Sequence, residues 1–312
     1  MRFSVAMCTY NGAKYIQQQL KSILNQTMPV DEIVICDDGS NDETIEIINS
    51  IKTNTFVDIR LHINQSHFGF KKNFIRAINL CHVDIIFLSD QDDIWYPDKV
   101  AEIFKWFSDN PKNKVVFTDA TLINDKGENI NERLWPRFGF DNNKRRYFDH
   151  GYGLDIWAWS NRATGATMAF KKDIVEKIKW EDAFCDYHDI IITLTGLANH
   201  CLGYIDKELI YYRLHDNQFC GAKDLPKELY HSPLKPCPLS LASFDINFLQ
   251  EQDKNHLEFI QQRYSFKYSH LSSLFKSISS YLREYKSWAY KFFFYDLFVS
   301  VRHRIRVVIN KF

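Results

Sequence analysis

Short apolar runs alternate with amphipathic segments along the first part of the chain. Four of these runs have the length and composition of buried strands, and they cover residues 3–8, 32–37, 58–63 and 84–89. The segments between them have the period of helices. Strands that alternate with helices predict βαβ units, so the pattern indicates an α/β fold with a mostly parallel sheet flanked by helices.

Local signals mark where the helices begin. The Asn11-Gly12 turn leads into a predicted helix over 14–24, and Ser40 with Glu43 has the spacing of a capping box before the isoleucine-rich segment that follows. Pro97 suits the first turn of a helix that runs to about residue 107. A further apolar run at 115–117 extends the predicted sheet.

The later part of the chain follows different patterns. Residues 124–159 are rich in Asn, Gly, Arg and Trp and show little periodicity, which predicts a long surface segment of the kind that carries function. After residue 225 come several prolines and then helix-compatible stretches without β alternation. We therefore expect one domain over 1–225 and a helical C-terminal extension over 226–312.

The end of the extension, residues 288–312, joins an aromatic run at 292–295 to a basic terminus. Its uninterrupted apolar stretch is far shorter than the roughly 20 residues that a membrane-spanning helix needs, and Asp296 interrupts it. Two placements fit the pattern equally well. The segment either lies in the interface of an anionic membrane or packs as a helix on the preceding domain.

Composition narrows the partners and the compartment. The chain carries 39 basic and 39 acidic side chains, so no overall field favours nucleic acid as a partner. Its seven cysteines include no C-x-x-C pair and no zinc-site spacing, which indicates free thiols in a reducing compartment. The first residues enter a strand without the features of a secretory signal. These observations predict a cytoplasmic protein, peripheral on the inner face of the cell membrane if residues 288–312 bind there.

Carboxylates are crowded at the end of the fourth predicted strand. Asp90, Asp92 and Asp93 directly follow the apolar run at 85–88. Like charges so close together call for a counter-ion, and hard oxygen ligands suit Mg²⁺ or Mn²⁺. An aspartate-rich turn is equally often a solvated loop or a helix cap, so this cluster alone leaves both interpretations open.

A second cluster favours the functional interpretation. Asp37 and Asp38 end the second predicted strand in the same way, and ligands of open α/β sheets bind beyond the carboxyl ends of strands. The two clusters therefore predict one shared crevice. The sequence has neither a G-x-x-x-x-G-K-[ST] loop nor a G-x-G-x-x-G after the first strand. A phosphorylated ligand would instead be met by a carboxylate-held cation and basic side chains, which favours a diphosphate leaving group over a redox dinucleotide.

Several motifs, in order and spacing, resemble those of the family 2 glycosyltransferases, which have the GT-A (Rossmann-like) fold with a mixed, mostly parallel sheet. They are Thr-Tyr-Asn-Gly at 9–12, Asp-Asp-Gly-Ser-Asn-Asp at 37–42, Ser-Asp-Gln-Asp-Asp at 89–93, the segment at 165–170, His188-Asp189 and the segment at 211–217. The likeness covers roughly the first two-thirds of the chain. The form of residues 89–95 is similar to bacterial rhamnosyltransferase-like members that build O-antigen, capsule or other surface polysaccharides.

The resemblance implies a nucleotide site at the first two clusters. Thr9 and Tyr10 would border the base, Asp38 or Asp37 would accept a hydrogen bond from N3–H of a pyrimidine, and Asp90 would lie near the ribose. Uracil and thymine share that donor, so the contact does not distinguish UDP from dTDP. The full set that the resemblance assigns to the nucleotide is Thr9, Tyr10, Asn11, Asp37, Asp38 and Asp90.

The resemblance also implies a metal and a diphosphate site. Asp92 and His215 would hold the Mn²⁺ or Mg²⁺ that bridges the diphosphate, with Asp93 behind them. Arg213 and His215 would lie beside the diphosphate, where the leaving group develops negative charge. The alternatives are a surface charge for the arginine and a buried core histidine.

An inverting transfer needs a base for the acceptor hydroxyl, and the family's His-Asp pair implies Asp189. The competing carboxylates are Asp182 and Asp186, and the alternative role for Asp189 is a simple N-cap of the helix predicted over 190–197. The resemblance implies acceptor contacts at Gly165, Ala166 and His188, and residues 124–159 are a further place for acceptor recognition.

The implied activity is transfer of a sugar, with inversion, from dTDP-rhamnose or a UDP-sugar to a hydroxyl of a glycan or lipid-linked oligosaccharide. One alternative is a non-catalytic relative that binds a nucleotide-sugar or a glycan. Another is a nucleotidyltransferase that makes sugar nucleotides. That enzyme needs a glycine-rich basic loop after the first strand, and residues 11–14 are too short and too poor in glycine for it.

Overall fold

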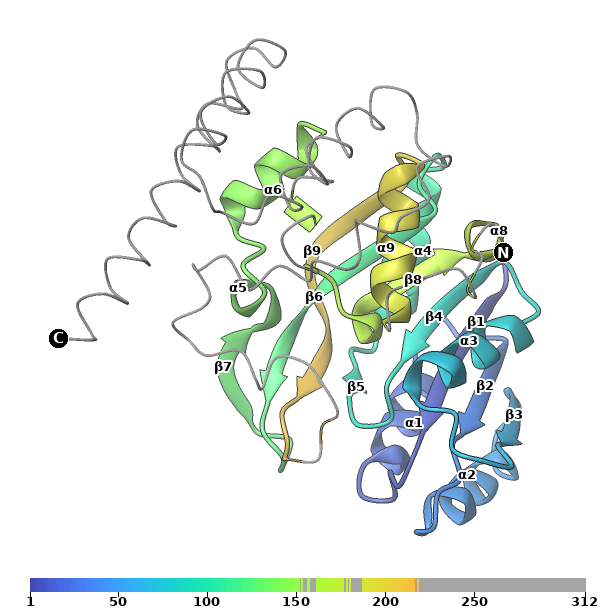
Figure 1. Cartoon of the computed structure of the whole chain (residues 1–312). Coiled ribbons are helices and arrows are strands. Elements are labelled where there is room, and N and C mark those ends of the chain that lie inside the picture. The colour runs from blue at the N-terminus through green and yellow to red at the C-terminus, as the bar shows by residue number, and fades with distance from the viewer. Residues whose placement is uncertain are drawn as a thin grey trace, which may run out of the picture.

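The computed structural model describes residues 1–151, 153, 156–157, 161–176, 178, 180, 187–216 and 218. The predicted extension over 226–312, with its segment at 288–312, lies outside these residues. Within them, a nine-stranded mixed sheet forms the centre of the molecule (Figure 1). Its strands are β1 (Phe3–Thr9), β2 (Glu32–Asp37), β3 (Asp58–Ile63), β4 (Ile85–Ser89), β5 (Ile94–Trp95), β6 (Val115–Ile123), β7 (Asn129–Arg133), β8 (Met168–Lys171) and β9 (Leu202–Arg213).

The strand order is β3-β2-β1-β4-β8-β6-β9-β5, with β7 paired to β6. β1 pairs in parallel with β2 on one side and with β4 on the other, and β3 continues the parallel half. In this register Thr9 lies opposite Asp37, and Met7 lies opposite Ser89. The carboxyl ends of β2 and β4 therefore flank the end of β1 at one edge of the sheet, as the sequence predicts.

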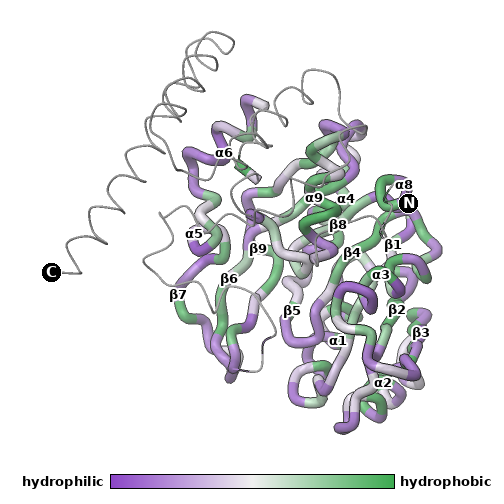
Figure 2. The backbone as a smooth tube through the Cα atoms, in the orientation of Figure 1, coloured by the Kyte–Doolittle hydropathy of each residue, from purple (hydrophilic) through white to green (hydrophobic). Residues whose placement is uncertain are grey.

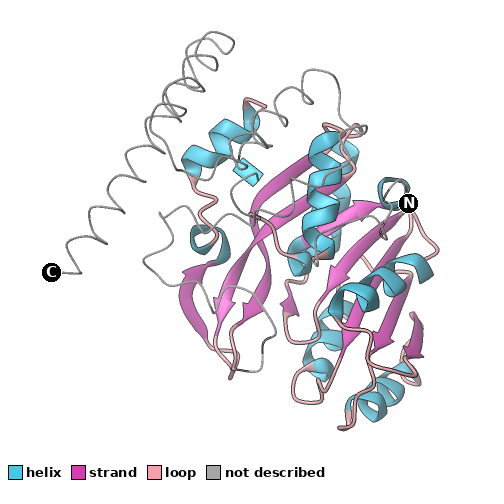
Figure 3. Cartoon of the chain, in the orientation of Figure 1, coloured by secondary structure: helices cyan, strands magenta, loops and turns pink. Residues whose placement is uncertain are grey.

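Helices cover both faces of the sheet (Figure 3). They are α1 (Ile16–Leu24), α2 (Thr44–Lys52), α3 (Phe70–Leu80), α4 (Lys99–Asp109), α5 (Leu134–Arg137), α6 (Asn142–Asp149), α8 (Lys172–Val175) and α9 (His188–Ala198), with a 3-10 turn η1 at Gly165–Thr167. Alternate residues of β1 face opposite cores: Val5 and Met7 pack with α1, α2 and α4, whereas Ala6 packs with α3 and α9.

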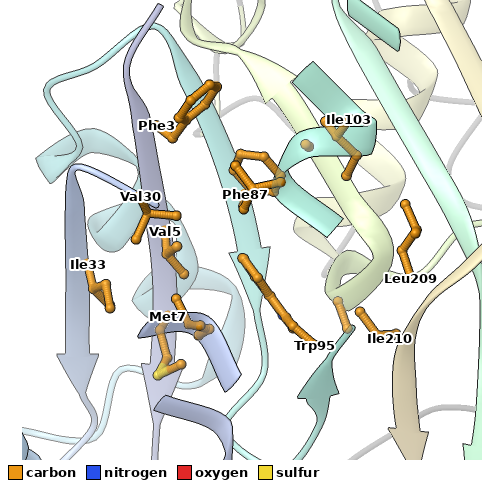
Figure 4. Packing of buried hydrophobic residues seen from close by; sticks show 14 of the residues in the cluster. Phe3, Val5, Met7, Val30, Ile33, Phe87, Trp95, Ile103, Leu209 and Ile210 are labelled. Atoms are coloured by element: carbon orange, nitrogen blue, oxygen red, sulfur yellow. The ribbon is translucent and has the colours of Figure 1, made fainter. Parts of the chain in front are cut away.

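The core on the α1 side joins both ends of the sheet. In Figure 4, Phe3, Val5 and Met7 of β1 and Phe87 of β4 lie in one layer with Trp95 and with Leu209 and Ile210 of β9. Burial of such side chains is the main source of stability. Figure 2 shows the corresponding hydropathy, with apolar colour along β1, β2 and β4 and mainly polar colour along α6.

The predicted capping box at Ser40 and Glu43 is wrong. α2 begins at Thr44, and its N-cap Glu43 makes no side-chain capping bond. The Ser40 hydroxyl donates instead to Asp37 Oδ2 at 2.6 Å, because the preceding carboxylate lies closer than the helix end. Asp42 accepts from the Thr44 N–H at 3.1 Å and so provides the side-chain acceptor at the start of α2.

The expectation that 124–159 is an irregular surface segment is also wrong. It contains β7, α5 and α6, and it contributes Trp135, Phe140 and Trp157 to the core. The three rings pack around Phe117 of β6 at centroid distances of 5.3–5.7 Å. These aromatic residues bury the segment without helical or strand periodicity, which is why the sequence pattern did not show it.

Two further predictions concern the thiols and the membrane. The cysteines that the structure describes, Cys8, Cys36, Cys81 and Cys201, are all free, as predicted for them. In the same part of the chain, every helix falls short of the length and apolar content that a bilayer crossing needs.

Candidate active site

The predicted site residues meet where β1, β2 and β4 end. β9 reaches the same place from the other half of the sheet, because the Arg213 N–H donates to Asp93 Oδ1 at 3.0 Å. α9 also points its first turn there: the negative charge of Asp189 is close enough to raise the pKa of Asp90. Segments more than 100 residues apart in the sequence thus build one edge.

Asp37, at the end of β2, is fully buried and surrounded by donors. Its Oδ1 accepts from the N–H groups of Gly39 and Ser40, at 3.1 and 2.8 Å. Its Oδ2 accepts from the hydroxyls of Thr9 and Ser40, at 2.7 and 2.6 Å. A carboxylate offers about four lone-pair positions, and four donors use them here. Asp37 therefore holds the end of β1 and the turn after β2 in place.

Asp38 is 4% exposed and anchors a different loop. Its Oδ1 accepts from Asn64 Nδ2 and the Phe68 N–H, both at 2.7 Å. Its Oδ2 accepts from the Gly69 N–H at 2.9 Å, and His67 Nδ1 lies 3.0 Å from the same oxygen. The loop before α3 is thereby fixed to the end of β2.

Tyr10 is 48% exposed and stands at the rim of this edge. Its backbone pairs with the side chain of Gln91, which accepts from the Tyr10 N–H at 2.9 Å and donates to its carbonyl at 3.0 Å. The amide of Gln91 lies over Gly12, where an added Cβ would be 2.2 Å from Oε1. Asn11 has a positive φ of 48° and donates its N–H to Ser40 Oγ at 2.9 Å. The segment after β1 is thus tied both to the turn after β2 and to the loop after β4.

The cluster after β4 has the opposite environment. Ligand oxygens of Asp90, Asp92 and Asp93 lie within 4.8 Å of one another. Burial, with the charges of Asp92 and Asp189, raises the pKa of Asp90 to about 7, and burial also raises the pKa of Asp93. Asp93 Oδ2 is buried without a hydrogen-bond partner. His215 Nε2 lies 2.7 Å from Asp92 Oδ2, which places an imidazole nitrogen beside the cluster. A divalent cation fits this donor set, because it supplies the missing positive charge.

A lysine lies beneath the cluster. Lys99, in the first turn of α4, is fully buried, donates to the Ala166 carbonyl at 2.9 Å and lies 4.0 Å from the centroid of the Trp95 ring. Burial lowers the pKa of Lys99 to about 7, although the charges of Asp93 and Asp90 oppose this shift. Lys99 thus joins the start of α4 to the η1 turn.

Arg213, predicted beside the diphosphate, is 2% exposed. Nε donates to the Asp92 carbonyl at 2.7 Å, and Nη2 donates to Gln18 Oε1 at 2.9 Å. Nη1 donates to the carbonyls of Asn124 and Asp125, at 3.3 and 3.2 Å. All three guanidinium nitrogens are therefore engaged by the chain. These hydrogen bonds position the loop that carries Asp92. They do not support the predicted direct contact of Arg213 with the diphosphate, which stays a prediction.

His215 is held in place by a neighbouring group. The ring of Tyr15 lies 5.0 Å from the imidazole, and the Tyr15 hydroxyl bonds to Asp125. Lys14 Nζ contacts both oxygens of Asp125, at 2.6 and 2.7 Å. The imidazole faces the Asp92 carboxylate, and the role of these two side chains as metal ligands stays a prediction.

Asp189, predicted as the base, lies in the first turn of α9. Its Oδ1 accepts from the Ile190 N–H at 2.8 Å, and Asn161 Nδ2 lies 3.3 Å from Oδ2. Burial raises the pKa of Asp189 to about 6, and backbone N–H groups, including that of Gly165, lower it in part. The N-cap residue of α9 is Tyr187, so Asp189 is not the cap that the alternative proposed.

The predicted acceptor residues are packed against Asp189. His188 is 6% exposed and stacks on Phe74 at 4.1 Å, and burial lowers its pKa to about 3, so the ring is neutral. A Cβ at Gly165 would lie 3.1 Å from His188 Nε2, so the turn packs closely against this ring. Ala166 is 2% exposed, with its carbonyl on Lys99. Direct acceptor contacts of these residues stay predictions. The competing bases lie outside the described residues: Asp182 and Asp186.

Sequence reasoning missed three groups that organise the site: Gln91, Lys99 and Asn161. Gln91 stands between two predicted ligands, which is the one signal that could have singled it out. Lys99 shares a helix face with Ile103 and Phe107, and this spacing is the signal that could have indicated its burial. Asn161 is 28 residues from Asp189 in the sequence, so their contact depends on the fold.

The fold and this edge define a class of protein: a glycosyltransferase with the GT-A fold. Residues 4–178 match the model of the family described as "Glycosyl transferase family 2". The chain belongs to glycosyl transferase family 2 and is an enzyme of that family.

Relatives and solved structures agree with this assignment. The chain is 30% identical over 222 residues to the dTDP-rhamnosyl transferase RfbG of Shigella flexneri, which covers 69% of this chain and 74% of the relative. It is 28% identical over 222 residues to the O-antigen biosynthesis glycosyltransferase WbnJ of Escherichia coli, which covers 68% of this chain and 80% of the relative. The crystal structure of S. aureus TarS 1–349 with UDP-GlcNAc shares the fold, with a TM-score of 0.57, 18% identity and coverage of 86% of this chain and 74% of that chain.

Proposed function

We propose that the protein is an inverting, metal-dependent glycosyltransferase that takes a sugar from a UDP- or dTDP-linked donor. The acceptor is a hydroxyl of a glycan or lipid-linked oligosaccharide in the synthesis of a bacterial surface polysaccharide. The observation that carries the proposal is the pairing, at one edge, of an aspartate pair whose oxygens are filled by donors from the chain with an aspartate cluster in which a buried carboxylate oxygen has no hydrogen-bond partner. The names of the two bacterial relatives support the polysaccharide, and the first supports dTDP-rhamnose as donor.

The first pair suits the nucleoside. Asp37 and Asp38 keep the end of β1 and the loop before α3 in a fixed arrangement, and Tyr10 presents an exposed ring beside them. A pyrimidine stacked on Tyr10 would place its N3–H toward Asp38. Asp90 is then the carboxylate nearest the ribose.

The second cluster suits the diphosphate. Asp92 and His215, with Asp90 and Asp93 around them, would hold Mn²⁺ or Mg²⁺, and the cation would neutralise charge on the departing diphosphate. Arg213 keeps the loop of Asp92 in register with β9 through its backbone and side-chain bonds. Lys99, at the start of α4, holds the η1 turn through the Ala166 carbonyl.

Asp189 suits the acceptor. An inverting transfer brings the acceptor oxygen to the face of the sugar opposite the diphosphate, and the base takes the hydroxyl proton as the new bond forms. With a pKa of about 6, Asp189 is mostly ionised at neutral pH and still basic enough to accept this proton. Asn161 orients the carboxylate through Oδ2.

The test is turnover by purified protein with a panel of UDP- and dTDP-sugars, with Mn²⁺ or Mg²⁺ and again with a chelator. We expect metal-dependent release of UDP or dTDP, faster with a matching acceptor. Asp189→Asn should keep donor binding and lose transfer by about 10²–10⁴-fold, the usual contribution of a general base. The matched control is Asp58→Asn, at the opposite end of β3 with its side chain 65% exposed.

Two results would count against the proposal. If no donor binds or turns over with either metal, the nucleotide-sugar assignment fails. If a donor binds with metal but stays unchanged with every acceptor offered, the chain is the non-catalytic relative instead.

A further inference from the structure

We propose that His67 occupies the place of the donor's pyrimidine ring in the free protein and has to leave it when the donor binds. This inference rests on the proposed function, since it assumes that Tyr10 and Asp38 receive the base. It assigns to His67 a role in setting donor affinity.

The imidazole makes the two contacts expected of the base. Its ring lies 4.8 Å from the ring of Tyr10, centroid to centroid, with the planes inclined by 57°. Its Nδ1 lies 3.0 Å from Asp38 Oδ2 and 3.4 Å from the carbonyl of the same residue. A pyrimidine on Tyr10 would direct its N3–H at the same carboxylate.

The base and the imidazole exclude each other on steric grounds. Two rings that hold a third between them need a separation of about 7 Å, twice the carbon contact distance of about 3.5 Å. The centroids of Tyr10 and His67 are only 4.8 Å apart. A base that stacks on Tyr10 from this side therefore displaces His67.

The Asp38 carboxylate also cannot bind the base and His67 at the same time, because its hydrogen-bonding positions are limited. Asn64, Phe68 and Gly69 already donate three hydrogen bonds to its oxygens. With His67 in place, all four lone-pair positions of the carboxylate face a nitrogen, so an arriving N3–H needs one of them to be released.

His67 is the partner of Asp38 that can be released. The side chain of His67 is 61% exposed, whereas Asn64 is 5% exposed and also bonds to Asn73. Phe68 and Gly69 donate through the backbone, so releasing them would move the loop. Rotation of His67 about its side-chain bonds leaves the loop held by three hydrogen bonds.

Competition of this kind lowers the apparent affinity of the donor. The apparent dissociation constant is the intrinsic one divided by the fraction of protein in which His67 is away. If that fraction is about 0.1–0.3, removal of the imidazole tightens binding of UDP or dTDP by about 3–10-fold. The affinity for a ligand without a base, such as inorganic pyrophosphate, should not depend on residue 67.

The experiment measures dissociation constants of UDP, dTDP and pyrophosphate, each with Mn²⁺, by calorimetry on the full chain. The variants are His67→Ala and His67→Ser, with circular dichroism to show that both fold. His82→Ala is the matched control, because His82 is also an exposed histidine, 67% by side chain, beside a buried carboxylate, Glu32 at 3.9 Å. We expect tighter UDP and dTDP binding for both His67 variants, with wild-type values for His82→Ala and for pyrophosphate throughout.

The outcomes distinguish failure of this inference from failure of the proposed function. If the His67 variants bind UDP and dTDP as the wild type does, or more weakly, the imidazole is not a competitor and only this inference is overturned. A gain that extends equally to pyrophosphate also overturns it, since the base would not be involved. If the folded wild type and its variants bind neither nucleotide, the proposed function fails and the inference fails with it.

Discussion

Two aspartate groups that look alike in the sequence have opposite surroundings in the structure. Asp37 and Asp38 are buried among hydrogen-bond donors from the backbone and from polar side chains. Asp90, Asp92 and Asp93 are crowded together, with raised pKa values for the first and last and a buried oxygen that has no donor. Both groups follow an apolar strand, so the difference comes from what the fold brings against each strand end.

The two aspartate groups therefore suit different roles, since the first group fixes loops and the second group suits cation binding. A carboxylate that has its donors within the chain fixes loops, as the first pair fixes the segments around Tyr10 and before α3. A carboxylate group that lacks donors lowers its free energy by binding a cation or a proton. Asp189 lies between the two cases, since burial raises its pKa while backbone N–H groups lower it.

The largest effect that tests this comparison is on turnover. Asp92→Asn removes one charge from the donor-poor cluster, and we expect turnover with Mn²⁺ to fall by about 10²–10³-fold, as on loss of a group that stabilises charge in the transition state. Thermal unfolding without metal should change little, because an amide at this position can still hydrogen-bond to His215 Nε2. Near-normal turnover of the variant would show that the cluster does not hold the catalytic cation.

The next effect is on stability and should have opposite signs in the two groups. Asp37→Asn should lower the free energy of unfolding by about 2–4 kcal/mol, because hydrogen bonds to a charged acceptor are lost or weakened. Asp93→Asn should leave it unchanged or raise it by up to about 1 kcal/mol, because a crowded buried charge disappears. Urea unfolding in the presence of a chelator measures both. Equal losses of unfolding free energy in the two variants would show that the two aspartate groups do not differ in this way.

The smallest effect is on the pH profile. Burial raises the pKa of Asp189 from 3.8 to about 6, so the base is protonated and inactive below that pH. We expect kcat/KM to be level above about pH 7 and to fall up to about tenfold per pH unit below pH 6. Asn161→Ala removes a hydrogen bond that lowers this pKa, so the fall should begin at a higher pH. A fall that does not move in this variant would report the metal site instead.

The parallel half of the fold could be predicted because its signals are local. The strands at 3–8, 32–37, 58–63 and 84–89 agree with β1 to β4 to within one residue at each end. Their carboxyl ends meet because adjacent parallel strands end at one edge, which places Asp37, Asp38 and Asp90 together without any knowledge of side-chain packing.

The other half depends on pairings between distant segments. β6 pairs in parallel with β9, and β8 is inserted antiparallel between β4 and β6. Nothing in the local pattern of residues 115–123 indicates a partner at 202–213. The same limit applies to the site: the burial of Arg213 by carbonyls from residues 92, 124 and 125 requires all of these pairings at once.

The contact between Gly12 and Gln91 has a consequence for how this enzyme can vary. The space that a side chain at position 12 would need is filled by the amide of Gln91, which also carries both hydrogen bonds to the Tyr10 backbone. A larger residue at 12 therefore requires the Gln91 amide to move, and this movement gives up the link between the first and fourth strand ends. The two positions therefore have to be changed together, because a change at either one loosens the segment that carries Tyr10.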